Sequence, residues 1–162
     1  LHDAITDVTG VNAVFNKLAL NDGSTADTDF YKEGTGALEL YDSAVQSYFL
    51  KTFGRNDREI TCECERSNQP SMIQVLHLAN GDTLNGKLAD TKSIIERMLA
   101  EKKTDAAIVD EAFLATLTRL PQPHEREGFL ALLTGAGESE RRVAIEDLFW
   151  GLMTSREFLF QH

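Results

Sequence analysis

Regularly spaced apolar residues in the second half of the chain constrain its fold more than any other feature. From residue 91 onward they recur three or four positions apart, the spacing that gathers side chains on one face of an α-helix. Start and stop signals separate the segments, with Thr104 as an N-cap, Pro123 in a first turn and Gly135 after a periodic run. The pattern predicts helices within 91–103, 105–120, 124–133, 138–154 and 154–160.

Each of these predicted helices has an apolar stripe that would face a core. Trp150 falls inside the apolar run of 138–154, so we expect it to be buried with its neighbours. A bundle of such helices would bury one continuous core. Its expected members are Ile94, Ile95, Met98, Leu99, Ile108, Val109, Ala112, Phe113, Ala115, Leu117, Ile145, Leu148, Phe149 and Leu152.

Helical patterns are also found in the first half of the chain. Leu1, Ile5 and Val8 share a face, and Gly10 fits the stop that follows. A later helix is predicted over 71–81, followed by a short helical stretch at 82–90. The apolar stripe of the helix over 71–81 consists of Met72, Val75, Leu76 and Ala79.

The remaining segments of the first half are less regular. Residues 20–36 are rich in Asp, Thr and Gly, which predicts a surface loop. A capping box that begins at Ser43 predicts a helix over 42–55. Short strands are expected near 37–40 and 59–64.

The segments together predict an all-α fold, a mostly helical bundle of six to eight helices. A length of 162 residues fits a single domain over 1–162, and a hydrophobic content of 42% is enough for a packed core. The chain starts in a helical pattern without an initiator Met, so we expect it to be a fragment of a longer precursor.

The charge of the chain excludes some classes of partner. The net charge is −10, and residues 1–50 carry 8 acids and 2 bases. Such a surface repels phosphate backbones and anionic lipid headgroups, so we expect no binding to nucleic acid. No apolar run approaches the roughly 20 residues that cross a bilayer, so we expect no membrane insertion. Neutral molecules, cations and basic proteins are the favoured partners.

The two cysteines, Cys62 and Cys64, allow three interpretations. In an extended chain their Cα atoms would be about 6.6 Å apart, near the upper limit for a disulfide. A bridge would therefore be strained and redox-active rather than structural. With His77 as a third ligand they could bind a metal, although a structural zinc site needs four. Buried free thiols are the favoured interpretation, because free Cys is among the most buried residue types.

The charged residues next to the cysteines have two interpretations as well. Two carboxylates, Glu63 and Glu65, would pair with Arg55, Arg58 or Arg66 and orient the loop, or would act as a pair of acid/base carboxylates in a pocket. His77 lies on a largely apolar helix beside Ile73, which is more typical of a core edge than of a ligand. The chain has no nucleophile elbow, P-loop, zinc-protease or dinucleotide motif, and no haem-attachment C-x-x-C-H. We therefore expect no cofactor and no metal.

Four stretches of the chain are similar to one family. "SYFLKTFGRNDREITCECERSNQPSMIQVLHLANGDTLNGKL" resembles the signature of a C-terminal domain of unknown function in large planctomycete multidomain proteins, which often carry a cytochrome-c-like domain upstream. "EAFLATLTRLPQPHERE" and "AIEDLFWGLMTSREFLFQH" resemble its closing helices, and "LHDAITDVTGV" resembles the segment before the signature. The family motif corresponds here to Cys62, Cys64, Glu65 and Arg66.

The resemblance implies a periplasmic or cell-envelope location, which would raise the odds of a disulfide. It assigns no activity. We expect a non-catalytic accessory or interaction module that docks on upstream domains of its own precursor, with a neutral polysaccharide or a second copy as further candidate partners. The alternative is a catalytic, thiol-redox or metal site built on the Cys62–Cys64 segment, with Glu65, Arg66 and His77 as its candidate residues.

Overall fold

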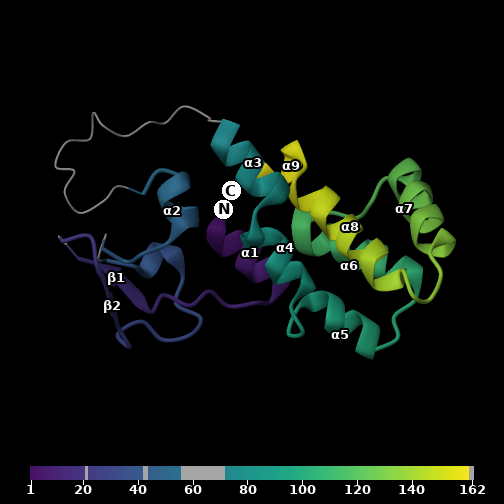
Figure 1. Ribbon diagram of the computed structural model, residues 1–162. Helices are drawn as coiled ribbons and strands as arrows, with labels where there is room; N and C mark the ends of the chain where they lie inside the picture. Colours follow the sequence, from purple (N-terminus) through teal and green to yellow (C-terminus); the bar gives the residue numbers. More distant parts are fainter. Residues whose placement is uncertain (21, 42–43, 56–71, 161–162) are drawn as a thin grey trace. The chain divides into compact units, whose positions relative to one another are not determined.

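The computed structural model describes residues 1–20, 22–41, 44–55 and 72–160 (Figure 1). The chain, predicted as a single domain, divides by its contacts into two compact units. Unit 1 contains Leu1, Asp3–Val11 and Leu84–His162, and unit 2 contains His2 and Asn12–Thr83. Unit 2 therefore interrupts unit 1 along the sequence.

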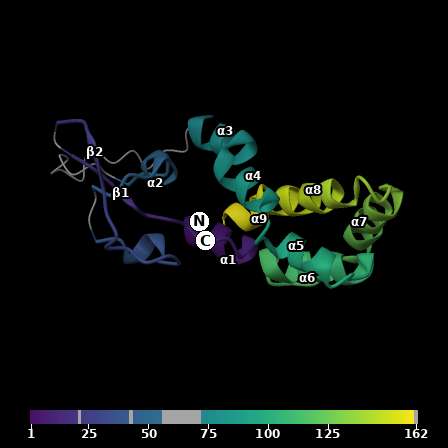
Figure 2. The same ribbon diagram turned by 60° about the horizontal axis from the view of Figure 1, so that its bottom comes forward.

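Unit 1 is helical in its described residues. α6 contacts α7, α8 and α9, and α8 also contacts α5 and α7, so α6 and α8 form the centre of this unit (Figure 2). α1 and α4 extend across the boundary between the units in the sequence. The helices with residues in unit 1 are α1 (His2–Thr9), α4 (Asp82–Ala89), α5 (Ile94–Ala100), α6 (Asp105–Leu117), α7 (Pro123–Gly135), α8 (Arg141–Met153) and α9 (Arg156–Leu159).

The helix boundaries of unit 1 follow from local chemistry. The Thr104 hydroxyl accepts a hydrogen bond from the Ala107 N–H at the start of α6, and Pro123 occupies the first turn of α7. Gly10 ends α1 in the left-handed conformation at φ 72°. These three predicted signals are confirmed.

The core of unit 1 matches the predicted stripes, with one exception. Of the expected residues, Leu99 and Ala115 are half-buried and the others are buried. Trp150 is 38% exposed, so the prediction that it is buried is wrong. Ile145, Leu148 and Phe149 lie on the inward face of α8, and Trp150 projects about 100° away from Phe149 around the helix.

Unit 2 is built around a small sheet. β1 (Lys17–Ala19) and β2 (Thr25–Asp27) are antiparallel, with Leu18 opposite Ala26, so β2 lies inside the expected surface loop 20–36. Leu18 also forms a bridge with Val45 on its other side. Phe15, Leu40 and Val45 form the core cluster of this unit. Its other elements are η1 (Ala37–Glu39), α2 (Tyr48–Thr52) and α3 (Met72–Asn80).

Two local predictions for unit 2 are wrong. The strand expected near 37–40 is the 3₁₀ helix η1, in which the Glu39 side chain accepts a hydrogen bond from the Gly36 N–H. The helix expected over 42–55 is limited to α2 and starts at Ser47, because residues 44–46 hydrogen-bond β1 through the Ala44 carbonyl and the Gln46 N–H. The strand expected at 59–64 lies outside the described residues.

The predicted fold class is confirmed. Seven helices of the described residues have seven or more residues, and the sheet has two strands. In the same residues, no helix combines the length and the apolar character needed to cross a bilayer.

Candidate functional site

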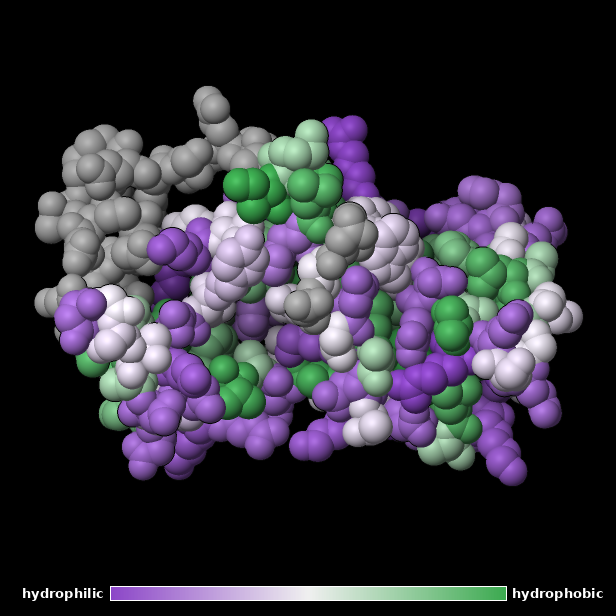
Figure 3. Space-filling view, viewed as in Figure 1, coloured by the Kyte–Doolittle hydropathy of each residue, from purple (hydrophilic) through white to green (hydrophobic). Residues whose placement is uncertain are grey.

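The outer face of α3 is apolar and exposed. Met72 is 71% exposed, Ile73 60%, Val75 57% and Leu76 54%. Figure 3 shows hydrophobic surface gathered over this helix. Large apolar side chains concentrated on one exposed helix face are unusual, whereas single exposed apolar residues are common. Of the predicted stripe, Met72, Val75 and Leu76 do share a face, but that face is exposed to solvent, and the side chain of Ala79 lies outside what the structure describes.

The exposed residues of α3 form one continuous surface. At 3.6 residues per turn, the order around the helix is Val75, Met72, Leu76, Ile73 and His77, an arc of about 200°. We call this arc, from Val75 to His77, the α3 face. Leu78 lies on the remaining side of the helix and is buried, so α3 is anchored by a narrow inward side.

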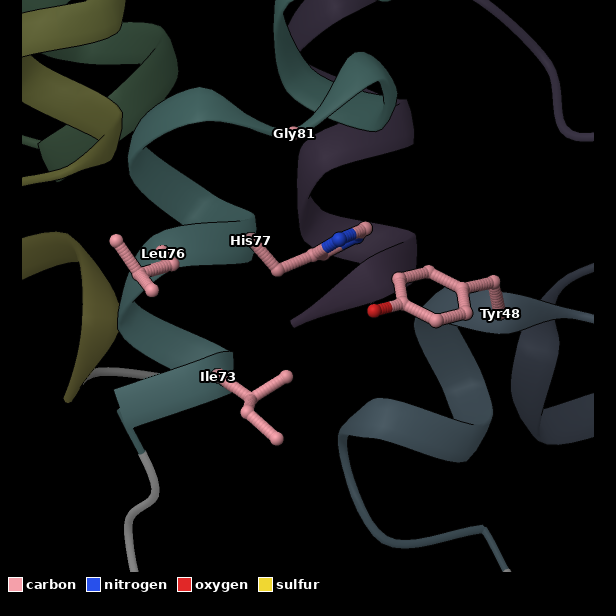
Figure 4. Close-up of a pocket in the computed structure, with 5 residues that line it drawn as sticks. All are labelled: Tyr48, Ile73, Leu76, His77 and Gly81. Carbon is pink, nitrogen blue, oxygen red and sulfur yellow. The ribbon is translucent and has the colours of Figure 1, made fainter.

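A pocket of about 310 Å³ opens beside the α3 face. It is lined by Tyr48, Ile73, Leu76, His77 and Gly81 (Figure 4). The figure shows the imidazole of His77 turned toward the ring of Tyr48, while Ile73 and Leu76 extend from the same helix. Among these described lining residues, none is a carboxylate, a lysine or an arginine.

His77 is half-buried and has aromatic neighbours. Its ring centroid lies 5.1 Å from Tyr48, 5.3 Å from Phe49 and 6.1 Å from Phe53, each in an edge arrangement. Phe49 and Phe53 stack at 4.4 Å. Aromatic pairs favour edge-to-face or offset contacts at these distances. These three rings therefore pack against the His77 imidazole and fix its orientation.

One ring nitrogen of His77 has a polar partner. Its Nε2 lies 3.3 Å from the Thr83 hydroxyl oxygen. A histidine beside a hydroxyl group can act as a general base, and such a base is usually oriented by a third group. Among the side chains that the structure describes, which do not include Asp82, the polar partner of the His77 ring is this hydroxyl and not a carboxylate. The geometry therefore provides a binding surface with a hydrogen-bonding imidazole at its edge.

Local contacts hold α2 and α3 together. The Gln74 side chain of α3 donates a hydrogen bond to the Thr52 carbonyl of α2 at 3.0 Å, and α2 itself is capped by the Ser47 hydroxyl, which accepts a hydrogen bond from the Leu50 N–H. Gly81 follows α3, where the chain passes so close to His77 that a Cβ would lie 2.0 Å from the His77 carbonyl oxygen. Glycine is therefore required next to the pocket.

The structure describes one of the five predicted site residues. His77 lies at the pocket, whereas Cys62, Cys64, Glu65 and Arg66 lie outside the described residues. The sequence reasoning missed Tyr48, Thr83 and Gly81. Tyr48 directly follows Ser47, the N-cap of α2, and Gly81 directly follows α3. Neither position in the sequence identifies a pocket without the tertiary fold.

The described part of the chain offers no clear metal site. In it, no group of three or more His, Cys, Asp or Glu side chains is placed to hold a metal ion. His77, with Thr83 and three aromatic rings around it, can donate or accept hydrogen bonds according to its tautomer.

Comparison with known proteins identifies a family. Residues 25–133, more than half of the chain, match the model of the family described as PSD1, protein of unknown function (DUF1553). The matched range includes the α3 face and the pocket beside it. No curated protein and no solved structure matches the chain.

Proposed function

The chain belongs to this family of proteins of unknown function, and we propose that it is a non-catalytic interaction module whose contact surface is the α3 face. The observation that carries the proposal is the exposure by more than half of Met72, Ile73, Val75 and Leu76.

Burial of the α3 face would drive association. Burying a Val, Leu, Ile or Met side chain fully contributes roughly 1.5–3 kcal/mol. Burial of the four exposed apolar side chains of α3 would together contribute several times that free energy. The pocket beside Ile73 and Leu76 would receive one projecting side chain of the partner, as a hot-spot residue fills a cavity at the centre of an interface.

The partner we favour is an upstream domain of the same precursor. The test places a photo-crosslinking amino acid at position 75 of the full-length protein, followed by mass spectrometry of the crosslinked peptides. We expect crosslinks to residues upstream of the domain, and we expect Leu76→Glu to reduce their yield. Crosslinks to a second copy of the protein would instead show that the α3 face is the contact surface of a homodimer.

Val143 provides a matched control for the crosslinking experiment. It is an apolar residue 53% exposed on α8, and its replacement by Glu changes the same chemistry on unit 1. Val143→Glu should leave the crosslinks from position 75 unchanged. If position 75 forms no crosslink, or if Leu76→Glu and Val143→Glu have equal effects, the α3 face is not the contact surface.

Two further parts of the proposal, the cellular location and the upstream domain, rest on the sequence resemblance alone. We assign the chain to an exported, periplasmic or cell-envelope protein of planctomycete type, with a cytochrome-c-like domain upstream. Cell fractionation with an antibody against the domain tests the location. Recovery of the full-length protein from the soluble cytoplasm would contradict it.

A neutral polysaccharide is a second candidate partner, and the pocket favours it. Sugar rings stack on aromatic side chains, and Tyr48, which is 67% exposed, lines the pocket beside His77. Affinity electrophoresis in gels that contain a neutral polysaccharide tests this function. Retardation should depend on Tyr48, and equal retardation of the Tyr48→Ala variant would exclude the pocket.

A further inference from the structure

Three aromatic rings form an exposed cluster elsewhere in unit 2. Phe30 and Tyr41 are 63% and 72% exposed, and their centroids lie 5.3 Å apart in a T-shaped arrangement. Tyr31 lies 5.2 Å from Phe30 and 5.6 Å from Tyr41. These three rings form one aromatic surface, which we call the Phe30 cluster, although Tyr41 follows Tyr31 by ten positions in the sequence.

Contacts with the core of unit 2 and with Arg55 hold the Phe30 cluster in place. Tyr31 packs against the core cluster that contains Phe15 and Leu40. The guanidinium of Arg55 donates a hydrogen bond to the Leu40 carbonyl at 3.0 Å, which fixes the backbone directly before Tyr41. The exposed rings are therefore ordered before any ligand arrives, which reduces the entropy lost on binding.

The chain around the cluster is acidic. Residues 22–41 contain five acids and one base, Lys32, and Arg55 adds a second positive charge at the Leu40 carbonyl. Asp29 directly precedes Phe30, Glu33 follows Tyr31 by two positions, and both carboxylate side chains are exposed. A cation placed on a ring face would gain from the ring quadrupole and from these carboxylates together, whereas an anion would be repelled.

We propose that the Phe30 cluster binds an arginine- or lysine-bearing segment of a basic protein partner. A guanidinium or ammonium group would lie on the outer face of Phe30, and Asp29 and Glu33 would attract the positive charge. Arginine fits best, because its planar group stacks on aromatic rings and pairs with carboxylates. This surface is separate in sequence and chemistry from the apolar α3 face, so the two proposals stand independently.

Calorimetric titration of the whole chain with a capped tetra-arginine peptide tests the proposal. We expect measurable binding at low salt that weakens as the salt concentration rises. The matched ligand is a capped tetra-citrulline peptide, which keeps the shape of arginine without its charge, and it should not bind. Cellohexaose serves as the probe for stacking of an uncharged sugar.

Two sets of variants separate the rings from the charges. Phe30→Ala with Tyr41→Ala should weaken binding at least about tenfold, and Asp29→Asn with Glu33→Gln should weaken it severalfold. Phe160→Ala is the control, since it removes a ring that is 77% exposed in unit 1. It should leave the dissociation constant within twofold, as should Leu76→Glu on the α3 face. Circular dichroism confirms that each variant is folded.

Three results would overturn the proposal. The first is the absence of tetra-arginine binding at low salt. The second is unchanged affinity after removal of both rings, which would mean that the acidic charge acts alone. The third is stronger binding of cellohexaose or tetra-citrulline than of tetra-arginine, which would identify the cluster as a surface for uncharged ligands.

Discussion

Arg119 donates two hydrogen bonds to Glu157, from Nε to Oε1 at 2.7 Å and from Nη2 to Oε2 at 2.8 Å, across 38 residues of sequence. The same guanidinium donates to both carboxylate oxygens of Glu125, at 2.8 and 2.9 Å. It also lies 5.3 Å from the ring centroid of Phe113. One side chain therefore connects the end of α6 with the first turn of α7 and with α9.

Replacing Arg119 should destabilise unit 1. The Arg119→Met variant keeps much of the apolar stem but leaves two carboxylates without their cation, so we expect a lower Tm in thermal unfolding followed by circular dichroism. The control is Arg97→Met. Arg97 is 59% exposed and makes a single 3.7 Å contact with Glu111, so its removal should have little effect. Equal Tm values for the two variants would contradict the structural role of Arg119.

Unit 1 should lose stability in acid through Glu125. Hydrogen bonds from Arg119 lower the pKa of Glu125 to about 2 from an ordinary value of 4.5. Because the folded state has the lower pKa, this stabilisation is complete above about pH 4.5 and is lost as the pH falls toward 2. The Tm of the wild-type chain should fall in this window more steeply than that of Glu125→Gln. Parallel Tm profiles for the two proteins would show that Glu125 is not the titrating group.

Gly81 should be intolerant of any side chain. A Cβ there would overlap the carbonyl oxygen of His77, so Gly81→Ala should cost about 1–3 kcal/mol and shift the ring-proton NMR signals of His77. Gly86 is the control, because it lies within α4 and a Cβ there meets nothing within 4 Å. Gly86→Ala should stabilise the chain by roughly 0.5–1 kcal/mol. Unchanged His77 signals in Gly81→Ala would mean that the close approach does not position the imidazole.

The two cysteines should be free thiols, a prediction that rests on the sequence. Without reductant, a thiol reagent should titrate two groups per denatured chain, and both should react more slowly in the folded protein if they are buried. Cys62→Ser and Cys64→Ser should each remove one group. Absence of titratable thiols would indicate a disulfide, and one zinc per chain by elemental analysis would establish a metal site.

The sequence predicts the helices of unit 1 well because local and tertiary preferences agree there. Thr104 and Pro123 occupy their preferred cap positions, and the stripe of α6 faces α7, α8 and α9. The helix predicted from the capping box at Ser43 does not begin there, because local and tertiary preferences disagree in this segment. Pairing of Val45 with β1 outweighs the local capping signal, and the sequence does not show that partner.

The candidate site was predictable only in part. His77 is identifiable as a histidine on an apolar helix, and the stripe of Met72, Val75 and Leu76 is visible in the spacing. Periodicity predicts which residues share a face but not whether another element covers that face. Tyr48 approaches His77 only through the packing of α2 on α3, a tertiary contact that no local pattern records.

The insertion of unit 2 into unit 1 sets an order for folding during synthesis. Three of the helix contacts in unit 1, between α6 and α7, α7 and α8, and α8 and α9, join successive helices, and such local contacts form rapidly. α1 leaves the ribosome before unit 2 does, but Lys87, which donates a hydrogen bond to the Val11 carbonyl, follows Val11 by 76 residues. We therefore expect α1 and the residues directly after it to reach their final place only after all of unit 2 has been synthesised.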